Sequence, residues 1–507
     1  MVLPTAPETK KSDKTAYFSE FSNNTTIHGF RYFSDRGITL FEKIWWFLTF
    51  CLCAYICASL IASNWKKWDE NPVFLSVSPK PMKQWEIPFP AITICPENKI
   101  WGTKYNFTHY REKFETGNMT DEELQHFADV TMFCHATPET YMFEGHNMSI
   151  DSLNFLINEF HGIQTLIHFC IWVGRTVQMC NFQFSPILTI EGLCISFNTL
   201  NANDLFTNKT YIFEGHFKHD NVSNWDFDNN YAKANEIGFP VRSSKITDYL
   251  TVRFNLNLNN IDKKCDKYEG YKIYAHHPAE LPSKYVKIGN EKKYKFGIKP
   301  EATITDSSLK NYAPHRRKCF YSYERPLKFF KIYTKQNCDT ECLANFTLKR
   351  CGCVPFYMPF EKSTPICGYS NFVCKSRARN ILLDMEMVSE VEKSSDLTDC
   401  DCLPSCTTIK YNLEVSVEEP GTEANFLSMV FTSLDFAFND VEFVPLTRNE
   451  LFGNVDFWAN LGGLLGLFCG FSAMSFFEII YYMTLRWMCP FCCFWKQRLG
   501  GLGKTVS

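Results

Sequence analysis

One acidic residue, Glu478, stands inside the long apolar run FWANLGGLLGLFCGFSAMSFFEIIYYM at residues 457–483. An ionised carboxylate at the centre of a bilayer costs about 2.5–3.5 kcal/mol on insertion scales, so this side chain is expected to face water or a partner. Gly462, Gly466 and Gly470 recur every four residues of the run and form a small-residue stripe if it is helical. Around a threefold axis, such carboxylates would attract cations while exposed backbone carbonyls replaced the water around a small ion. The chemistry indicated is therefore cation coordination.

Other interpretations of this run stay open. Glu478 could snorkel to the cytosolic interface, and the glycine stripe could serve as a helix dimer contact with no pore. A buried core helix is disfavoured, because the run is too long and is followed by aromatic residues and cysteines.

The cysteines form a second chemical pattern. Of the 23, three lie in an apolar run near the N-terminus and four in or just after the second run, which leaves sixteen between them, an even number suited to complete pairing in an oxidising compartment. The same stretch holds six N-x-Ser/Thr glycosylation sequons, at Asn106, Asn118, Asn147, Asn208, Asn221 and Asn345. The middle of the chain is thus predicted to be extracellular.

Spacing suggests how some cysteines pair. Cys338 and Cys342 are four apart, which places them about 6 Å apart along one helical face, and Cys400 and Cys402 are two apart, about 6.6 Å on one strand face. An antiparallel arrangement could form two rungs, although spacing alone leaves other connectivities open. Zinc binding is the competing interpretation, but extracellular thiolates would not stay reduced.

Two membrane spans would place these residues. The segment from Ile44 to Ala62 carries no charge over the length a helix needs to cross a bilayer, and tryptophans flank it at positions 45, 46 and 65. We expect an uncleaved signal anchor here, with a cytosolic N-terminus at 1–43 and the span at 44–63. An extracellular region at 64–452, a second span at 453–484 and a cytosolic C-terminus at 485–507 follow. Within the extracellular region, 251–258 alternates like a strand, and 121–127 and 151–160 resemble short helices.

Four motifs occur in the order found in one family of channels. The stretch from Asn460 to Ser472 with Phe477–Tyr482 resembles the second transmembrane segment of degenerin and epithelial sodium channel subunits. Gly470-Phe471-Ser472 is similar to their Gly-x-Ser selectivity filter, and Ala459 falls at their small-residue position where bulky substitutions hold channels open. His28-Gly29 resembles their gating motif, and the string from Phe89 to Cys95 resembles the start of their ectodomain core.

The resemblance implies an α+β membrane protein with two transmembrane helices and a large disulfide-rich ectodomain, built of a β core and peripheral helices as in acid-sensing channels. It implies a homo- or heterotrimeric, amiloride-sensitive, sodium-selective channel of the plasma membrane, with both termini cytosolic, gated by an unknown extracellular chemical or mechanical stimulus in a sensory role. The pore-lining residues would be Ala459, Asn460, Gly463, Gly466 and Glu478. No metal or cofactor is expected besides the permeant Na⁺. Tyr481 occupies the place of a second acidic residue in acid-sensing members, which argues against strong proton gating.

The resemblance also implies a disulfide pattern, with a thumb domain at about 319–406. The pairs of this domain would be Cys319 with Cys406, Cys338 with Cys402, Cys342 with Cys400, Cys351 with Cys374, and Cys353 with Cys367. Upstream, the implied pairs are Cys95 with Cys194 and Cys170 with Cys180. Cys134 and Cys265 are left for each other, as an extra pair similar to that of insect pickpocket subunits. A stiff rod of bridges would transmit movement of the outer ectodomain to the pore.

Other functions are less well supported. The formal charge of −3 gives no reason to expect a nucleic-acid partner, and no catalytic or phosphate-binding motif indicates an enzyme such as an ectonucleotidase. A scavenger-receptor type lipid receptor shares the two-pass topology but would need no carboxylate or glycine stripe in its second span. An ATP-gated trimeric channel would lack the Gly-x-Ser motif and the string from Phe89 to Cys95.

Overall fold

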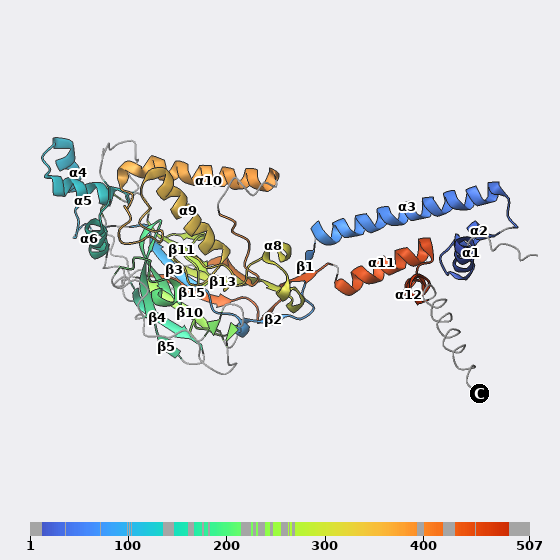
Figure 1. Cartoon of the computed structure of the whole chain (residues 1–507). Helices are drawn as coiled ribbons and strands as arrows, with labels where there is room; N and C mark the ends of the chain where they lie inside the picture. Colours follow the sequence, from blue (N-terminus) through green and yellow to red (C-terminus); the bar gives the residue numbers. More distant parts are fainter. Residues whose placement is uncertain are drawn as a thin grey trace, which may run out of the picture. The chain divides into compact units, whose positions relative to one another are not determined.

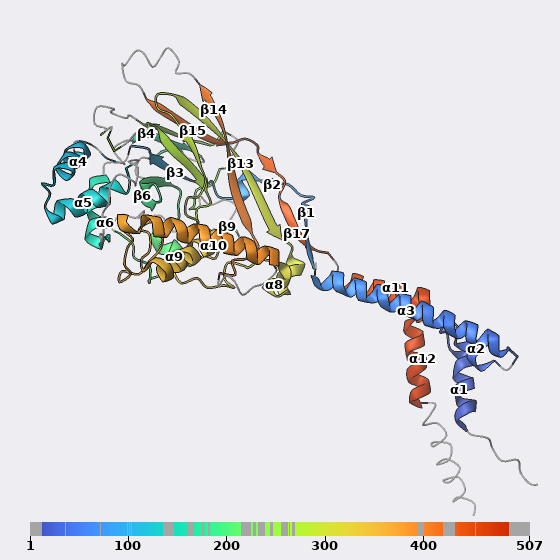
Figure 2. The ribbon, with the colours of Figure 1, turned by 90° about the horizontal axis from the view of Figure 1, so that it is seen from above.

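A computed structural model shows the chain as two compact units, one of residues 1–74 with 449–507 and one of residues 75–448. The structure describes residues 13–35, 37–70, 72–98, 100, 102, 104–134, 147–160, 167–174, 177–180, 183–213, 225–226, 230–231, 239–243, 247–254, 262, 264–265, 269–392, 400–418, 431–451 and 453–485. Figures 1 and 2 show the elements named below.

The β structure of the described residues comprises two main sheets. The larger has the order β1-β17-β13-β15-β10-β4-β5, with β14 also paired to β13, and the smaller has the order β12-β11-β3-β7-β6. The strands of the larger sheet are β1 (Val73–Val77), β4 (Ile167–Val173), β5 (Val177–Met179), β10 (Tyr249–Phe254), β13 (Lys293–Thr305), β14 (Thr408–Glu418), β15 (Thr432–Phe438) and β17 (Leu446–Glu450). Those of the smaller sheet are β3 (Ala91–Pro96), β6 (Phe184–Thr189), β7 (Gly192–Phe197), β11 (Tyr271–His276) and β12 (Tyr285–Ile288). Two short pairs are β2 (Met82–Lys83) with β16 (Glu442–Phe443), and β8 (Trp225–Asp226) with β9 (Asn230–Tyr231).

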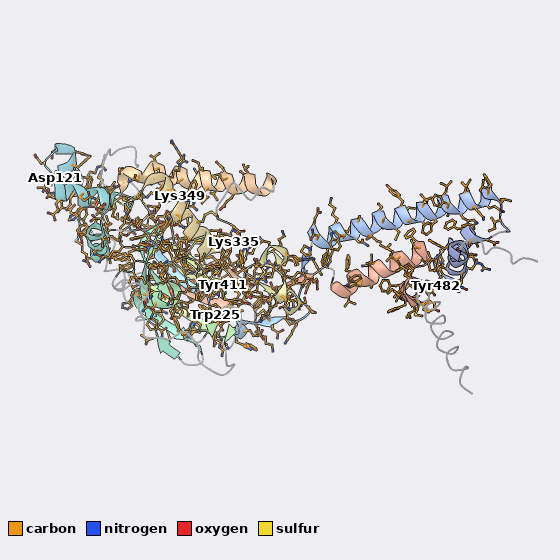
Figure 3. The ribbon with its side chains drawn as sticks, in the orientation of Figure 1. Asp121, Trp225, Lys335, Lys349, Tyr411 and Tyr482 are labelled. Carbon is orange, nitrogen blue, oxygen red and sulfur yellow. A yellow bond between two sulfur atoms is a disulfide. The ribbon has the colours of Figure 1, made fainter. Side chains whose placement is uncertain are left out.

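Alternating burial explains why the sheets hold together. In β15 every second side chain is buried, including Leu434 and Phe436, as expected for a strand with one face on the core. All six residues of β3 are buried, which fits a strand covered on both faces. Phe436 stacks on Phe296 of β13 at 4.6 Å between ring centroids. In the same unit, the Tyr411 hydroxyl of β14 donates a hydrogen bond to the Pro88 carbonyl at 2.7 Å (Figure 3 labels Tyr411).

Helices lie at one end and along one side of the sheets of the larger unit (Figures 1 and 2). They are α4 (Phe107–Thr116), α5 (Asp121–Thr131), α6 (Ile150–Phe160), α7 (Ala202–Leu205), α8 (Pro314–Arg317), α9 (Lys335–Cys351) and α10 (Phe372–Glu392). The group α4, α5 and α6 lies at one end, and α9 packs beside α10 (Figures 1 and 2). The predicted helices at 121–127 and 151–160 are confirmed as α5 and α6. The predicted strand at 251–258 is present as β10, and its residues 255–258 lie outside the described part of the chain.

In its described residues, the smaller unit consists mainly of helices. They are α1 (Asp13–Asn24), α2 (Phe30–Ser34), α3 (Leu40–Glu70), α11 (Asn454–Cys469) and α12 (Ala473–Met483). Within the described residues, α3 is long and apolar enough to cross a membrane by itself. The helices α11 and α12 are long and apolar enough only when taken together, as a pair bent by 71°. The second apolar run is therefore two helices and not one continuous helix.

Candidate functional site

The predicted filter residues Gly470, Phe471 and Ser472 form the break between α11 and α12. Gly470 has a φ of +63°, a left-handed conformation that a residue with a Cβ adopts only at a cost. Its N–H donates to the Gly466 carbonyl at 3.0 Å, and the Phe471 N–H reaches back to the Leu465 carbonyl at 3.2 Å. The 5→1 bond from the left-handed Gly470 to Gly466 is that of an αL helix end, where glycine is the usual residue.

Ser472 begins the next helix. Its hydroxyl accepts a hydrogen bond from the Ser475 N–H at 3.3 Å, and the Ser475 hydroxyl is 3.1 Å from the Ser472 nitrogen. Serine is among the preferred N-cap residues because its oxygen satisfies an otherwise unpaired amide of the first turn. The Gly-x-Ser spacing therefore ends one helix and starts another within three residues, which leaves non-helical backbone where the sequence predicts an ion-coordinating filter.

The His-Gly motif lies against this break. The His28 N–H donates to the carbonyl of Cys469, the last residue of α11, at 3.0 Å. A Cβ built on Gly470 would lie only 2.5 Å from the His28 ring, so the glycine also permits this close approach. Gly29 itself has a φ of +86° and stands at the start of α2. Two motifs about 440 residues apart in the sequence thus form one site in the smaller unit.

Glu478 contacts Thr26, which lies two residues before His28 in the N-terminal segment. Its carboxylate lies 3.3 Å from both the backbone nitrogen and the hydroxyl of Thr26, and the Thr26 hydroxyl is 2.6 Å from that of Ser475. Ser475 is fully buried and Glu478 is half-buried. Water or a partner was expected at this carboxylate, and the structure provides the partner. Thr26 and Ser475 could not be identified from the sequence, because neither belongs to a recognisable local pattern.

The other predicted pore-lining residues occupy α11. Ala459, Asn460 and Gly463 are exposed in the single chain, and Gly466 is half-buried. A Cβ added at Gly462 or Gly463 would meet no atom within 4 Å. This part of the helix is therefore free, within the described chain, to accept close contact from another helix.

The sixteen cysteines of the larger unit all form disulfides. Upstream of the thumb, the structure joins Cys95 to Cys194, Cys134 to Cys265, and Cys170 to Cys180. In the thumb it joins Cys319 to Cys406, Cys338 to Cys402, Cys342 to Cys400, Cys351 to Cys374, and Cys353 to Cys367. These disulfides are the pairs that the resemblance implies.

The local structure around the two inner rungs agrees with the sequence only in part. Cys338 and Cys342 lie on α9, as their spacing predicts. The strand expected at Cys400 and Cys402 is wrong, because this segment is a turn in which Asp401 has a φ of +35°. The rungs therefore join a helix to a turn.

Polar contacts hold the loops around this ladder. The Glu341 carboxylate of α9 accepts hydrogen bonds from the backbone N–H groups of Lys328 and Phe329, each at 2.8 Å. Arg317, which is 1% exposed, donates to the Cys319 carbonyl at 3.1 Å and pairs with Glu324. A buried guanidinium is stable only when its N–H donors are hydrogen-bonded. These contacts therefore position the loop that carries Cys319.

A buried histidine network lies at the end of β11. His276 Nε2 is 2.8 Å from the Thr93 hydroxyl, and His276 Nδ1 is 3.0 Å from the His277 carbonyl. Burial lowers the pKa of His276 to about 4 and that of His277 to about 3, and it raises the pKa of Glu280 to about 7. Desolvation disfavours every charged form here, so both histidines are neutral near pH 7 and Glu280 is partly protonated there.

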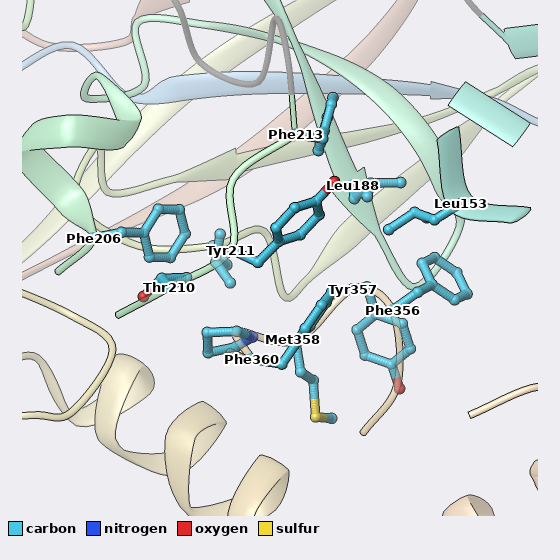
Figure 4. A pocket seen from close by; sticks show the side chains of 12 residues that line it. Leu153, Leu188, Phe206, Thr210, Tyr211, Phe213, Phe356, Tyr357, Met358 and Phe360 are labelled. Atoms are coloured by element: carbon cyan, nitrogen blue, oxygen red, sulfur yellow. The ribbon is translucent and has the colours of Figure 1, made fainter. Parts of the chain in front are cut away.

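The larger unit has two notable concave features. One is an aromatic cavity of about 40 Å³ beside Tyr211 and the segment 356–360, as Figure 4 shows. It has room for a water molecule but not for an organic ligand, so it is a packing feature. The other is a groove of about 650 Å³ over β10, β13, β14 and β15. That volume suits a small molecule, and its charged residues include Lys293, which pairs with Glu418 at 3.2 Å and Asp435 at 3.6 Å.

The sequons occupy different environments. Asn106, Asn118, Asn147 and Asn208 are exposed, whereas Asn345 is half-buried in the middle of α9. Asn221 lies outside the described residues. Among the residues that the structure describes, no group of three or more His, Cys, Asp or Glu side chains is arranged to hold a metal ion.

Comparison with known proteins decides the family. The family model described as "Amiloride-sensitive sodium channel" matches residues 21–482. The chain belongs to this family. It is 28% identical to Pickpocket protein 28 of Drosophila melanogaster, covering 93% of the chain and 78% of that protein. It is 23% identical to the sodium channel protein Nach of the same fly, over 92% and 87% of the two chains. Identity to acid-sensing ion channel 1C of Danio rerio is 22%, over 91% and 82%.

Membership of the amiloride-sensitive sodium channel family confirms the resemblance inferred from the sequence motifs. The chain is a sodium channel subunit of the degenerin and epithelial sodium channel group, whose members are plasma-membrane ion channels and not enzymes. Members form multimeric channels with related subunits. The matched region begins before His28 and ends after Glu478, so it includes every element of the site described above.

Proposed function

We propose that this chain is a pore-forming subunit of a trimeric, amiloride-sensitive, sodium-selective channel, and that Gly470, Phe471 and Ser472 are its filter. The observation that carries the proposal is the helix break at these residues, which leaves a short non-helical segment inside an apolar run. Irregular backbone is tolerated at membrane depth only where protein buries it or water reaches it. A narrow, wet lumen satisfies this condition.

The pore would form where three copies of α11 meet. In this arrangement Ala459, Asn460, Gly463 and Gly466 line the path toward the filter, and the unencumbered glycines let the helices approach closely. The last carbonyls of α11 point along the helix toward the break, where the negative end of the helix dipole favours a cation. Selectivity would then come from carbonyl and hydroxyl oxygens that replace water around Na⁺.

The proposed topology has α3 as the first span and the bent pair of α11 and α12 as the second. All sixteen disulfide-bonded cysteines lie between them, which favours an extracellular middle and cytosolic termini. The groove over β10, β13, β14 and β15 provides a place for an extracellular ligand to act, and the bridged thumb provides a route for force. A sensory role for such a channel is part of the proposal.

The contact between the N-terminal segment and the filter supports a gating role for His28 and Gly29. Thr26 and His28 reach Glu478, Ser475 and Cys469 by hydrogen bonds, so a displacement of this segment changes the surroundings of the filter directly. Glu478 would hold the N-terminal segment against α12 through Thr26. When this contact breaks, the carboxylate would be free to add its negative charge to the proposed pore.

Expression in a cell without native sodium channels tests the proposal. The chain, alone or with related subunits, should give an inward Na⁺ current that amiloride blocks, and Gly470→Arg should abolish the current at unchanged surface level. An ATP-evoked current would favour an ATP-gated channel, and lipid uptake without current a scavenger-type receptor. Surface trimers that conduct in no combination would contradict the proposal.

A further inference from the structure

The groove over β10, β13, β14 and β15 lies on the side of the larger sheet that faces away from the core. In β13 and β15 the buried residues alternate with exposed or half-buried ones, and the latter form the floor of the groove. The strand register arranges these outward residues in three rows that run from β10 through β15 to β13: Arg253 with Ser433 and Lys293, Thr251 with Asp435 and Lys295, and Tyr249 with Ala437 and Gly297.

Small residues make the third row hollow. Gly297 has no side chain and Ala437 has only a methyl group, whereas Tyr249 beside them is 40% exposed and forms a wall. A Cβ on Gly297 would lie 1.9 Å from Asn439 Oδ1, so the glycine also lets Asn439 lie across the floor and donate to Glu414 at 2.7 Å. The groove of about 650 Å³ is therefore large enough for a small organic molecule.

Arg253 is the charged residue of the groove that has no counter-charge. Its guanidinium lies over the Phe169 ring, 5.6 Å from the ring centroid, and within the described part of the chain no acceptor or carboxylate pairs with it. Stacking on a ring holds a guanidinium while leaving its N–H groups free. The other charged lining residues are paired: Lys293 with Asp435 at 3.6 Å, Lys295 with Glu418 at 2.5 Å, and Glu414 with Lys299 at 3.7 Å.

A second polar group without a partner lies beside Arg253. Ser433 is opposite Arg253 on one side and opposite Lys293 on the other, so it stands between two cationic side chains. Its hydroxyl is buried and has no hydrogen-bond partner among the described residues. A buried hydroxyl without a partner is costly. An anionic oxygen that parts the two flexible cationic side chains would accept hydrogen bonds from this hydroxyl and from the guanidinium together.

We propose that the groove binds a small organic monocarboxylate, with its carboxylate held by Arg253 and Ser433 and its apolar body over Ala437 and Gly297. A planar guanidinium binds a carboxylate through two parallel N–H···O bonds, which a lysine cannot form. One unpaired cation calls for one negative charge on the ligand. A second charge would have no partner, because the remaining charged residues of the groove already pair with one another.

Thermal unfolding of the purified full-length chain tests binding without requiring a current. The probe is phenylpropionate, and phenylpropylamine is the control of similar body and opposite charge. The carboxylate should raise the unfolding temperature in a saturable manner, because it binds the folded state, and the amine should not. Arg253→Gln should weaken the apparent affinity at least tenfold, and Ser433→Ala by a smaller factor. Arg350→Gln, at an exposed arginine of α9 outside the groove, should leave it unchanged.

The Arg253 side chain is exposed, so Arg253→Gln should fold with an unchanged unfolding temperature in the absence of the probe. Arg253→Lys keeps the charge but not the fork of N–H donors and should show intermediate affinity. Equal stabilisation of the wild type and Arg253→Gln by phenylpropionate overturns the inference. So does stabilisation by the amine that equals that by the carboxylate, or a wild type that phenylpropionate does not stabilise at any soluble concentration.

The effect on current rests on the proposed channel function. Phenylpropionate applied from outside should change the amiloride-sensitive current at least twofold in the wild type and in Arg350→Gln, and leave it unchanged in Arg253→Gln. A response that persists in Arg253→Gln, or binding without any response, contradicts a regulatory role for the groove. Binding to a chain that conducts in no assembly would instead refute the proposed function and leave the site established.

Discussion

At the scale of single residues, the site depends on positions where backbone geometry dictates the residue type. Gly470 needs both a left-handed φ and space for the His28 ring. The Gly-x-Ser motif could be recognised from the sequence, because helix-ending glycines and helix-capping serines are local signals. The contacts of Thr26 with Ser475 and Glu478 could not, since they join residues about 450 positions apart.

The buried histidine network predicts a pH dependence of stability. The native state keeps His276 neutral down to about pH 4, whereas an unfolded chain protonates it near its ordinary value of 6.5. Between these values the unfolded state binds more protons, so stability falls on acidification by about 1.4 kcal/mol per pH unit. His277 acts in the same direction. Glu280, with a pKa raised to about 7, acts in the opposite direction between pH 7 and 4.5.

His276→Gln should therefore reduce the stability lost between pH 6.5 and 5.0 by about 2 kcal/mol. Unfolding of the purified channel at these two pH values measures the difference, with the exposed His109→Gln as the control. An equal acid sensitivity in the wild type and His276→Gln would show that protonation of His276 does not contribute.

At the scale of elements, α9 is the support of the thumb. It carries Cys338, Cys342 and Cys351, and its Glu341 clamps the preceding loop. The helix and its cysteine face could be predicted from the spacing of four. The turn at Cys400 and Cys402 could not be predicted. Two cysteines that are two residues apart can pair with a helix from either a strand or a turn, and only the tertiary structure decides between these. The break between α11 and α12 could be predicted from local signals. Its bend angle could not, because no sequence pattern specifies an angle between helices.

Removing one rung tests how the ladder stabilises this element. Cys338→Ser with Cys402→Ser leaves the neighbouring rung Cys342–Cys400 in place, so only the short segments between the two rungs gain freedom in the unfolded chain, and chain entropy predicts a loss of about 2 kcal/mol. Cys353→Ser with Cys367→Ser opens a loop with a sequence separation of 14 and should cost about 3 kcal/mol. Urea unfolding of the two variants gives the comparison, and a much larger loss from Cys338→Ser with Cys402→Ser would contradict the entropic account.

At the scale of the whole molecule, the chain divides into a helical unit that contains the candidate pore residues and a disulfide-bonded unit that contains the sequons. The overall class could be predicted from the sequence, because apolar runs, cysteines and sequons each report the environment of a segment. The groove over β10, β13, β14 and β15 could not be predicted, since it is assembled from strands that are distant in the sequence.

Glycosylation tests the orientation of the larger unit. Asn118 and Asn208 are exposed outside regular helices and should carry glycans, whereas Asn345, half-buried within α9, should not. Gel mobility before and after a glycosidase measures this. Asn118→Gln and Asn208→Gln should each remove one glycan and Asn345→Gln none. A chain without glycans at the cell surface would contradict an extracellular middle.

The most direct test of the central claim is the Na⁺ to K⁺ permeability ratio, obtained from reversal potentials of an assembly that contains this chain. Ser472→Cys removes the hydroxyl that caps α12 at the break and should lower the ratio roughly tenfold, equivalent to about 1.4 kcal/mol. Met474→Cys, an exposed position on α12 two residues further on, should leave it unchanged. A conducting assembly whose ratio is the same in the wild type and Ser472→Cys would contradict the assignment of Gly470, Phe471 and Ser472 as the filter.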